Sequence, residues 1–454
     1  MADRANHLIA QDMVFEELQG DAFTLAKSLD SHMQKSFAPD ALKHLRLFSS
    51  AEVAELLGVS QTNLRKLHHD GKIPDVPLDD RGRKMYSAKD VFAVRLALAR
   101  MAKDPVQYLP GRVGTDQVQV IATCTFKGGS GKSTSCAHLA QRFAMKGYRV
   151  LVIDMDPQAS LSSMMGLRPE IDLTERGTIY DAIRYDARLP MQDIVRKSYF
   201  YNLDIAPGGL ILSEYETETP RAIRQNVQPP FYLRLRDAID QVQDQYDLVF
   251  IDCPPQLGFL TLSAMVASTA LLITVIPNMI DVASLAQFLK MSTSLLEVVR
   301  ESGHSLDYDF MRYLICRYEP SDTPQTQMAG FLRVQFGKRV MTEPFLKSTA
   351  VSDAGLTQQT LYEVNRSDFH RSTYDRAVES VNKVANELEL SIQRAWGRNC
   401  WAVRTSLTTQ LRNRCQSRRN RPPCPRHFSM GPSEPCGTIF AKLAHVRFKI
   451  WTPT

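Results

Sequence analysis

A glycine-rich segment, KGGSGKST at residues 127–134, limits the fold of this chain more than any other feature. The residues before it, 118–126, are apolar and β-branched like a buried strand, and residues 135–146 have the pattern of a helix. A loop in this position directs backbone N–H groups and the positive end of the helix dipole toward an anion. The segment therefore predicts a phosphate-binding loop for a nucleoside triphosphate, whereas an isolated match would also fit an ordinary glycine-rich turn.

The loop departs at its beginning from the GxxxxGK[ST] pattern of phosphate-binding loops. Phe126 stands where that pattern has its first glycine, and an additional lysine, Lys127, precedes the next glycine. The residues of the segment that we expect to contact the nucleotide are Lys127, Gly128, Gly129, Ser130, Gly131, Lys132, Ser133 and Thr134.

Three carboxylates follow apolar runs that have the composition of buried strands. Asp154 and Asp156 end one such run, RVLVIDMDPQ, and Asp252 ends another, YDLVFIDCPP. Alternate residues of a strand face the same side, so Asp154 and Asp156 are expected together at the carboxyl edge of a sheet, where α/β proteins bind ligands. Like charges this close destabilise a fold unless a cation or a water network uses them. We therefore predict a magnesium site and water-handling carboxylates; solvated loop carboxylates are the alternative for the first pair.

A fourth strand-like run, ALLITVIP, ends at Pro277 and Asn278, which we also expect at the nucleotide. Strands that carry a glycine loop, paired carboxylates and a terminal Asp, with helical segments between them, predict an α/β fold with a doubly wound parallel sheet.

Residues 125–160 and 246–285 resemble the ParA/MinD class of deviant Walker A ATPases. Within that class, the chain is similar to the plasmid partition ATPases of the ParA kind, in particular the RepA type of repABC replicons. The segments that carry this narrower resemblance are DMDPQAS (154–160), IDCPPQLG (251–258), FLKSTAVSDAG (345–355) and TYDRAVES (373–380). The similarity extends from about residue 48 to residue 398.

The resemblance implies ATP and Mg²⁺ as cofactors and assigns roles to individual residues. Lys132 would contact the β- and γ-phosphates, and Asp156 would orient the attacking water. Lys127 would reach the nucleotide of the second subunit of a homodimer, so that hydrolysis depends on dimerisation and ATP acts as a switch. The residues implied to hold the metal or its water shell are Ser133, Asp154 and Asp252.

A second module is predicted upstream, over residues 48–112. Residues 48–60, FSSAEVAELLGVS, place apolar residues on one helical face, with Gly58 for a tight turn and Ser60 as the cap of a helix over 61–69. This is a helix-turn-helix pattern, and the basic RGRK segment that follows resembles the wing of a MerR-like winged helix. A helical hairpin used for packing is the alternative. The residues expected to contact DNA are Gln61, Thr62, Asn63, Arg65, Lys66, Arg81, Arg83 and Lys84.

The resemblance implies that this module binds the operator of its own operon. An apolar stripe at helical spacing in residues 8–37 is either core or a dimerisation helix. The predicted division is therefore an N-terminal helical segment (1–47), a winged helix-turn-helix domain (48–112), an ATPase domain (113–398) and a tail (399–454).

Charge separates the tail from the rest of the chain. Residues 399–454 contain ten Lys and Arg against one acidic residue, a charge of +9, so the overall +6 leaves −3 for residues 1–398. Any DNA affinity of the body must then come from local patches rather than from net charge. The candidates outside the helix-turn-helix are Lys338, Arg339, Lys347, Arg366, Arg371 and Arg376.

The tail is rich in Arg, Pro and Ser and has four cysteines at irregular spacing, without helical or strand periodicity. Disorder is the expected state, and either a basic arm that binds DNA or a frameshifted or read-through extension would have this composition; a zinc site lacks the usual paired spacing. The four cysteines of the body form no CxxC pair and are expected to be reduced and buried. These residues are Cys124, Cys136, Cys253 and Cys316.

No apolar run of about 18 residues and no signal-peptide core is evident, so a cytoplasmic, nucleoid-associated protein is expected. The hypothesis is a dimeric partition ATPase that represses its own operon and works with a centromere-binding protein of the ParB or RepB type. The alternative is a transcriptional repressor that only senses ATP. A MinD-like membrane ATPase is disfavoured because residues 378–396 have the pattern of an ordinary helix, and an iron–sulfur reductase because the cysteines show no paired pattern.

Overall fold

Seven strands form the central sheet of the computed structural model, which describes residues 43–168, 177–398 and parts of 14–31. The strand order is β5-β6-β4-β7-β3-β8-β9, and every neighbouring pair is parallel except the short edge pair β5–β6. The strands are β3 (Gln119–Cys124), β4 (Val150–Asp154), β5 (Arg196–Lys197), β6 (Leu203–Ala206), β7 (Leu248–Asp252), β8 (Ala270–Val275) and β9 (Phe310–Ile315). The predicted parallel sheet with helical crossovers is therefore confirmed.

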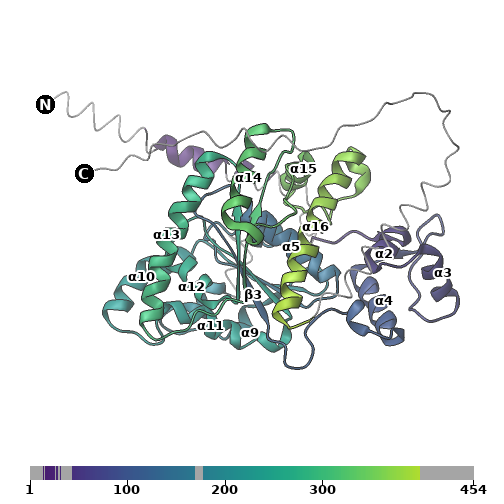
Figure 1. Cartoon of the computed structure of the whole chain (residues 1–454), viewed down its shortest axis with the longest axis horizontal. Helices are drawn as coiled ribbons and strands as arrows, with labels where there is room; N and C mark the ends of the chain where they lie inside the picture. Colours follow the sequence, from purple (N-terminus) through teal and green to yellow (C-terminus); the bar gives the residue numbers. More distant parts are fainter. Residues whose placement is uncertain are drawn as a thin grey trace, which may run out of the picture. The chain divides into compact units, whose positions relative to one another are not determined.

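Helices cover both faces of this sheet, as its fully buried strands require. Figure 1 shows α5 and α16 on one side of β3, and α12 and α13 on the other. The longer helices of this part are α5 (Lys132–Met145), α10 (Leu212–Arg224), α11 (Phe231–Asp240), α12 (Phe259–Ala267), α13 (Met279–Glu301), α14 (Thr323–Phe336), α15 (Thr349–Leu356) and α16 (Arg371–Ala395). Shorter ones are α6 (Ser160–Met164), α8 (Ile179–Ile183), α9 (Met191–Ile194) and the 3₁₀ turns Gln243–Gln245, Gly337–Arg339 and Arg366–Asp368.

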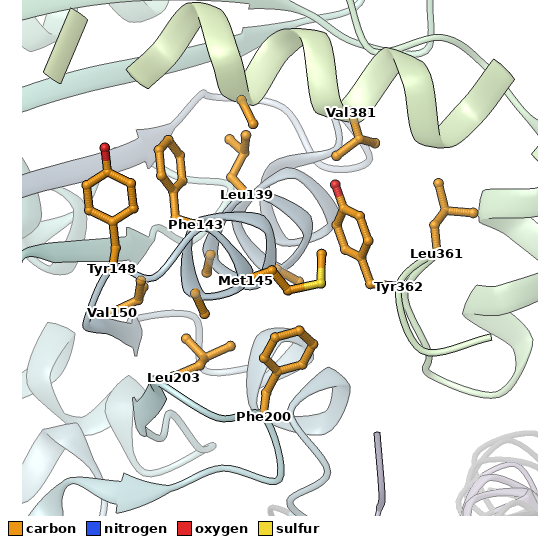
Figure 2. Packing of buried hydrophobic residues seen from close by; sticks show 14 of the residues in the cluster. Leu139, Phe143, Met145, Tyr148, Val150, Phe200, Leu203, Leu361, Tyr362 and Val381 are labelled. Carbon is orange, nitrogen blue, oxygen red and sulfur yellow. The ribbon is translucent and has the colours of Figure 1, made fainter. Parts of the chain in front are cut away.

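Alternating strand residues divide the core into two layers. Ile121 of β3 and Phe250 of β7 belong to the cluster under α5, whereas Val120 and Ala122 belong to the cluster under α11 and α12. Figure 2 shows the first layer, where side chains of α5 pack between the sheet and α16. The buried residues labelled there are Leu139, Phe143, Met145, Tyr148, Val150, Phe200, Leu203, Leu361, Tyr362 and Val381. Helix α5 is thus packed along its length, which makes it a rigid support for the loop before it.

The N-terminal part contains α2 (Ser50–Leu57), α3 (Gln61–His69) and α4 (Ala88–Met101), the turn Pro105–Gln107, and a two-stranded antiparallel pair, β1 (Phe48–Ser49) with β2 (Met85–Tyr86). Gly58 ends α2 with a left-handed backbone (φ 67°), and the Ser60 hydroxyl accepts the Asn63 N–H at 3.1 Å. The expected turn, cap and helix boundaries are therefore present. Buried residues of α2 and α3 belong to the same core cluster as those of α5, so these helices pack on the part of the chain that contains the central sheet.

Contacts divide the chain into two units, residues 1–402 and 403–454. The basic tail lies outside the described residues, as does most of the apolar stripe at 8–37. Of that stripe, Leu18 and Leu25 are described and are 68% and 62% exposed. They are therefore not part of the core of a single chain.

Helix α13 qualifies the expectation that no segment could span a membrane. It is the one helix, in the part of the chain that the structure describes, that is long and apolar enough by length and composition. Because Leu285 and Phe288 of this helix are buried in the core, and a core helix passes the same criterion, α13 is weak evidence for a membrane span.

Candidate nucleotide-binding site

The glycine loop joins β3 to α5 at the carboxyl edge of the sheet. Gly129 and Gly131 have φ values of 74° and 86°, a backbone region that side-chain-bearing residues rarely adopt. Gly131 is the residue before α5, and no side chain caps this helix. The first backbone N–H groups of α5, which have no partner within a helix, are therefore directed at the space in front of the loop.

Lys132 begins α5 and is buried beside the carboxylates. Its Nζ donates to the carbonyl of Lys127 at 3.3 Å, and it lines the cavity described below. Burial lowers the pKa of Lys132, and the charge of Asp252 opposes this shift. The ammonium therefore makes one long hydrogen bond among the described residues, and the neighbouring Asp252 carboxylate favours its charged form.

Asp154 and Asp252 are directly opposite each other in the β4–β7 register. Asp154 accepts the N–H and the hydroxyl of Ser162 at 2.8 and 2.7 Å through Oδ2, and the N–H of Asp156 at 3.2 Å through Oδ1. Asp252 is fully buried, yet neither of its oxygens has a hydrogen-bond partner in the described part of the chain. The Ser133 hydroxyl lies close enough to lower the pKa of Asp252, an effect smaller than those of burial and of the Asp154 charge, which raise it.

Burial has a strong effect on both carboxyls. It raises the pKa of Asp154 to about 6 and that of Asp252 well above its ordinary value, with repulsion from Asp154 as the second cause for Asp252. The neighbouring Thr123 hydroxyl, which is opposite Asp252 in the β3–β7 register, also lacks a partner among the described residues. Such orphaned oxygen groups fit a divalent cation, because Mg²⁺ prefers oxygen ligands.

The protein supplies only part of a metal coordination shell. No group of three His, Cys, Asp or Glu side chains within the described ranges could hold a metal ion. Mg²⁺ normally keeps several waters and takes one or two carboxylates together with substrate phosphates. The donor set of Ser133, Asp154 and Asp252 therefore fits Mg²⁺ that arrives with a phosphate ligand.

Asp156 is at the edge of the same cluster and lines the cavity. Its Oδ1 accepts the Gln158 N–H at 2.9 Å, and burial raises the pKa of the carboxyl. Gly208 passes close by: a Cβ there would lie 2.6 Å from the Asp154 carbonyl oxygen, so only glycine fits. The two aspartates predicted to lie together at the sheet edge do so.

Lys127 lies on the other side of the loop. Its Nζ donates to Asp281 Oδ2 at 2.9 Å; the lysine side chain is 42% exposed, and that of Asp281 is 4% exposed. Lys127 does not line the cavity. The additional lysine is therefore held by its own chain, away from the space in front of α5.

A cavity of about 1200 Å³ extends from the loop. It is larger than the roughly 300–1,000 Å³ typical of small-molecule sites, and thus large enough for a nucleoside triphosphate. Seven of the predicted site residues line it: Gly128, Gly129, Gly131, Lys132, Ser133, Thr134 and Asp156. The Ser130 hydroxyl instead forms a hydrogen bond with the Thr274 hydroxyl at 3.1 Å. The metal-set carboxylates Asp154 and Asp252 are buried behind this lining.

Pro277 and Asn278 are not among the lining residues. The side chain of Asn278 instead caps α13, where its Oδ1 accepts the N–H of Asp281 at 2.9 Å. The opposite wall comes from residues that the sequence reasoning did not assign to the nucleotide site: the segment 316–321 after β9, the segment 345–352 and the first turns of α16. The FLKSTAVSDAG motif (345–355) covers the segment 345–352, but in the sequence it supported only the family resemblance and not the site.

Two arginines stand in this wall. Arg317 has a left-handed backbone (φ 52°), and its Nη1 approaches the carbonyl of Gly129 at 3.5 Å. Arg376 of α16 lines the cavity and forms no ion pair with any described residue. Together with Lys132 they give the cavity a cationic lining, which favours a polyanionic ligand.

The predicted DNA-contacting residues lie on α3 and on the hairpin at residues 78–84, and most of them are exposed. Gln61, Thr62, Asn63, Arg65 and Lys66 are exposed, and Arg81 is exposed at the hairpin tip. Two hairpin cations are partly neutralised, because Arg83 pairs with Asp79 at 2.7 Å and Lys84 pairs with Asp75.

The basic residues of the body are similarly divided. Lys347 pairs with Glu319 at 3.0 Å and Arg366 with Asp375. Lys338, Arg339 and Arg371 are exposed. The four cysteines of the body are free and buried, as predicted.

A glycine loop between β3 and α5, with carboxylates at the ends of two neighbouring strands, defines a P-loop protein of the α/β class. Comparison with known proteins agrees: the family model described as AAA domain matches residues 118–302. A putative replication protein A from Rhizobium rhizogenes is 47% identical over 84% of this chain and 95% of that protein. The chromosome partitioning protein ParA of Caulobacter vibrioides (strain NA1000 / CB15N) is 30% identical over 53% of this chain and 85% of that protein.

A solved structure described as a partition protein aligns with a TM-score of 0.58 at 15% identity, covering 82% of this chain and 98% of that one, which supports the fold. The chain belongs to the ParA/MinD-type P-loop ATPases, the family of the plasmid and chromosome partition proteins.

Proposed function

We propose that this protein binds ATP with Mg²⁺ in the cavity in front of α5, hydrolyses it as a homodimer, and uses the cycle to segregate a plasmid. The observation that carries the proposal is the buried group formed by Lys132, Asp154 and Asp252 behind an uncapped helix N-terminus. Unsatisfied N–H donors face the cavity and the unsatisfied oxygens of Asp252 lie behind it, as the two ends of a Mg²⁺–triphosphate require.

Each residue has a role that follows from its position. The N–H groups of the loop and Lys132 bind the β- and γ-phosphates, and Ser133, Asp252 and Asp154 would hold the metal or its water shell. Mg²⁺ would neutralise charge that develops between the β- and γ-phosphate oxygens. Asp156, at the cavity surface, accepts a hydrogen bond from the attacking water and orients it. The wall from 316–321 and 345–352 encloses the nucleoside.

Lys127 provides the switch. In a single chain it pairs with Asp281, so it must leave this partner to reach the phosphates of a second subunit. Leaving the pair has a cost, because the Asp281 carboxylate is 4% exposed and would lose its cation; the phosphate oxygens of the second subunit would offset it. ATP therefore favours a dimer in which each subunit supplies a lysine to the other, and ADP favours separation.

The exposed surface of α3 and the hairpin binds operator DNA in the major groove and represses the operon, with Arg65, Lys66 and Arg81 as its free cations. The exposed basic residues of the body bind nucleoid DNA without sequence preference, and the protein acts in the cytoplasm with a ParB- or RepB-type partner. An ATP-sensing repressor without partition activity would keep operator binding but lack partner-stimulated turnover.

The test is ATP turnover of Lys127→Gln with the centromere-binding partner and DNA present. We expect a loss of roughly 10-fold or more relative to wild type, because a positive charge at the transferring phosphoryl group is removed. Lys103→Gln, which removes an exposed lysine that takes part in none of the proposed contacts, is the matched control and should retain full turnover. Equal rates for Lys127→Gln and wild type would refute the trans-acting lysine, and partner-independent turnover in wild type would favour the repressor.

A further inference from the structure

The carboxyl end of α5 is bound by a buried arginine of the N-terminal module. Arg95, on α4, is 4% exposed. Its Nε donates to the carbonyl of Met145, the last residue of α5, at 2.9 Å. Its Nη2 donates to the carbonyl of Leu56 in the last turn of α2 at 2.8 Å, and its Nη1 to that of Tyr108 at 3.3 Å. One guanidinium therefore joins the carboxyl ends of two helices from different modules.

The electrostatics of this contact make it specific. No carboxylate forms an ion pair with Arg95 within the described residues. Its charge is stabilised by the terminal carbonyls of α5 and α2, which carry the negative ends of both helix dipoles, and by the charge of Glu389 without direct contact. Burial lowers the pKa of Arg95 to about 10, so the side chain remains charged at neutral pH. Losing either carbonyl would leave a buried charge undersatisfied, which opposes independent movement of the two helices.

The chain around the contact is adapted to it. Gly147, two residues after α5, has a φ of 97°, and a Cβ there would lie 3.3 Å from Arg95 Cδ. A side chain at this position would strain the backbone and crowd the arginine stem. The neighbours of Arg95 on α4, Val91, Val94 and Leu98, are buried in the same core as α2 and α5.

Helix α5 is the connection between this contact and the nucleotide. It has 14 residues, a length of about 21 Å, and is packed between the sheet and α16 as a rigid rod. The phosphate loop lies at its first residue and the Met145 carbonyl at its last. A shift or tightening of α5 on nucleotide binding would therefore reach Arg95 without an intermediate flexible segment.

We propose that Arg95 is a positioning residue that couples the nucleotide site to the α2–α3 module by holding the carboxyl ends of α5 and α2 together. The inference rests on the proposed nucleotide binding at residues 127–134. The coupling is reciprocal: DNA bound on α3 alters nucleotide affinity by the same factor by which the nucleotide alters DNA affinity.

Hydrogen exchange of the full-length protein tests the coupling without a known operator. Mg²⁺ with a non-hydrolysable ATP analogue should slow exchange of the amides of residues 128–135, and in wild type also of residues 54–59, by about fivefold or more. In Arg95→Lys, which cannot span three carbonyls, protection at 128–135 should persist and protection at 54–59 should be lost. Arg234→Lys is the matched control, since Arg234 is also fully buried and donates to main-chain carbonyls (of Pro229 and Arg184), but away from α5; it should behave as wild type.

The outcomes separate the two hypotheses. Protection at 128–135 without protection at 54–59 in wild type would overturn the coupling and leave nucleotide binding intact. Equal protection at 54–59 in wild type and Arg95→Lys would likewise overturn the role of Arg95. No protection at either segment would refute both the nucleotide site and the coupling. If Arg95→Lys does not fold, as judged by circular dichroism, Arg95→Gln replaces it, and the wild-type measurement by itself still decides whether α2 responds.

Discussion

A buried cation lies at each end of α5, and the two differ in how many hydrogen bonds they make. At the amino end, Lys132 makes one long hydrogen bond among the described residues and faces a cavity of about 1200 Å³. At the carboxyl end, Arg95 donates to three carbonyls and does not line that cavity. A binding site leaves donors unsatisfied until the ligand arrives, whereas a structural contact satisfies them at once. A buried charge by itself therefore does not distinguish a ligand-binding group from one that holds helices together. The number of its hydrogen-bond donors that already have a partner does.

The largest expected effect comes from replacing the lysine at the amino end of α5. Lys132→Ala should reduce ATP turnover by about 100-fold or more, because the cation at the transferred phosphate is removed. The free energy of unfolding should change little, since this lysine has few partners to lose. Turnover and urea denaturation measure the two quantities. A variant that kept its turnover would exclude Lys132 from the site.

The carboxyl end should respond in the opposite way. Arg95→Met should lower the free energy of unfolding by about 3 kcal/mol, because three buried carbonyls lose a charged donor. Nucleotide affinity should change far less than in Lys132→Ala. Urea denaturation and calorimetric titration with the analogue provide the comparison. A stability loss no greater than that of an exposed control, Arg81→Met, would contradict the structural role.

The same comparison, between a buried group without hydrogen-bond partners and one that has them, applies to Asp252 and Asp154. Asp252→Asn should raise the free energy of unfolding without ligand by about 1–3 kcal/mol, because it removes a buried charge that lacks a partner. It should also abolish Mg²⁺-dependent nucleotide binding. Asp154→Asn is the control: Asp154 already accepts three hydrogen bonds, some of which an amide cannot accept, so it should gain less stability than Asp252→Asn.

The pH dependence follows from the direction of these pKa shifts. Burial raises the folded-state pKa of both acids, so the folded protein binds more protons than the unfolded chain, and the destabilisation grows as pH rises through the folded pKa, about 6 for Asp154. The gain from Asp252→Asn should therefore be larger at about pH 8 than at about pH 5. An equal gain at both would contradict a raised pKa.

The smallest effect concerns Lys127. Asp281→Asn should change stability by less than about 1 kcal/mol, because the Lys127 end of the pair is 42% exposed and an asparagine oxygen can still accept its hydrogen bond. It should increase turnover at low protein concentration by no more than about fivefold, since Lys127 no longer has a competing partner in its own chain. Glu301→Gln, at the other end of α13, is the control. Reduced turnover in Asp281→Asn would mean that the pair supports the active state.

Much of the site could be predicted from sequence because it is local. The loop 127–134, the register partners Asp154 and Asp252, and the turn at Gly58 with its cap at Ser60 depend on backbone geometry and strand periodicity, which short segments determine. The placement of Asn278 could not be predicted in this way: its position after a strand suggested the nucleotide, whereas its side chain caps α13.

The sequence by itself determined the parallel sheet, the loop and the identity of the charged groups at its edge, since each follows from patterns within a few residues. Tertiary structure decided which of those groups have partners. The pair of Lys127 with Asp281, the cavity wall from 316–321 and 345–352, and the contact of Arg95 with two helix ends join residues far apart in the chain. Such contacts depend on how rigid elements pack, and no local pattern encodes that.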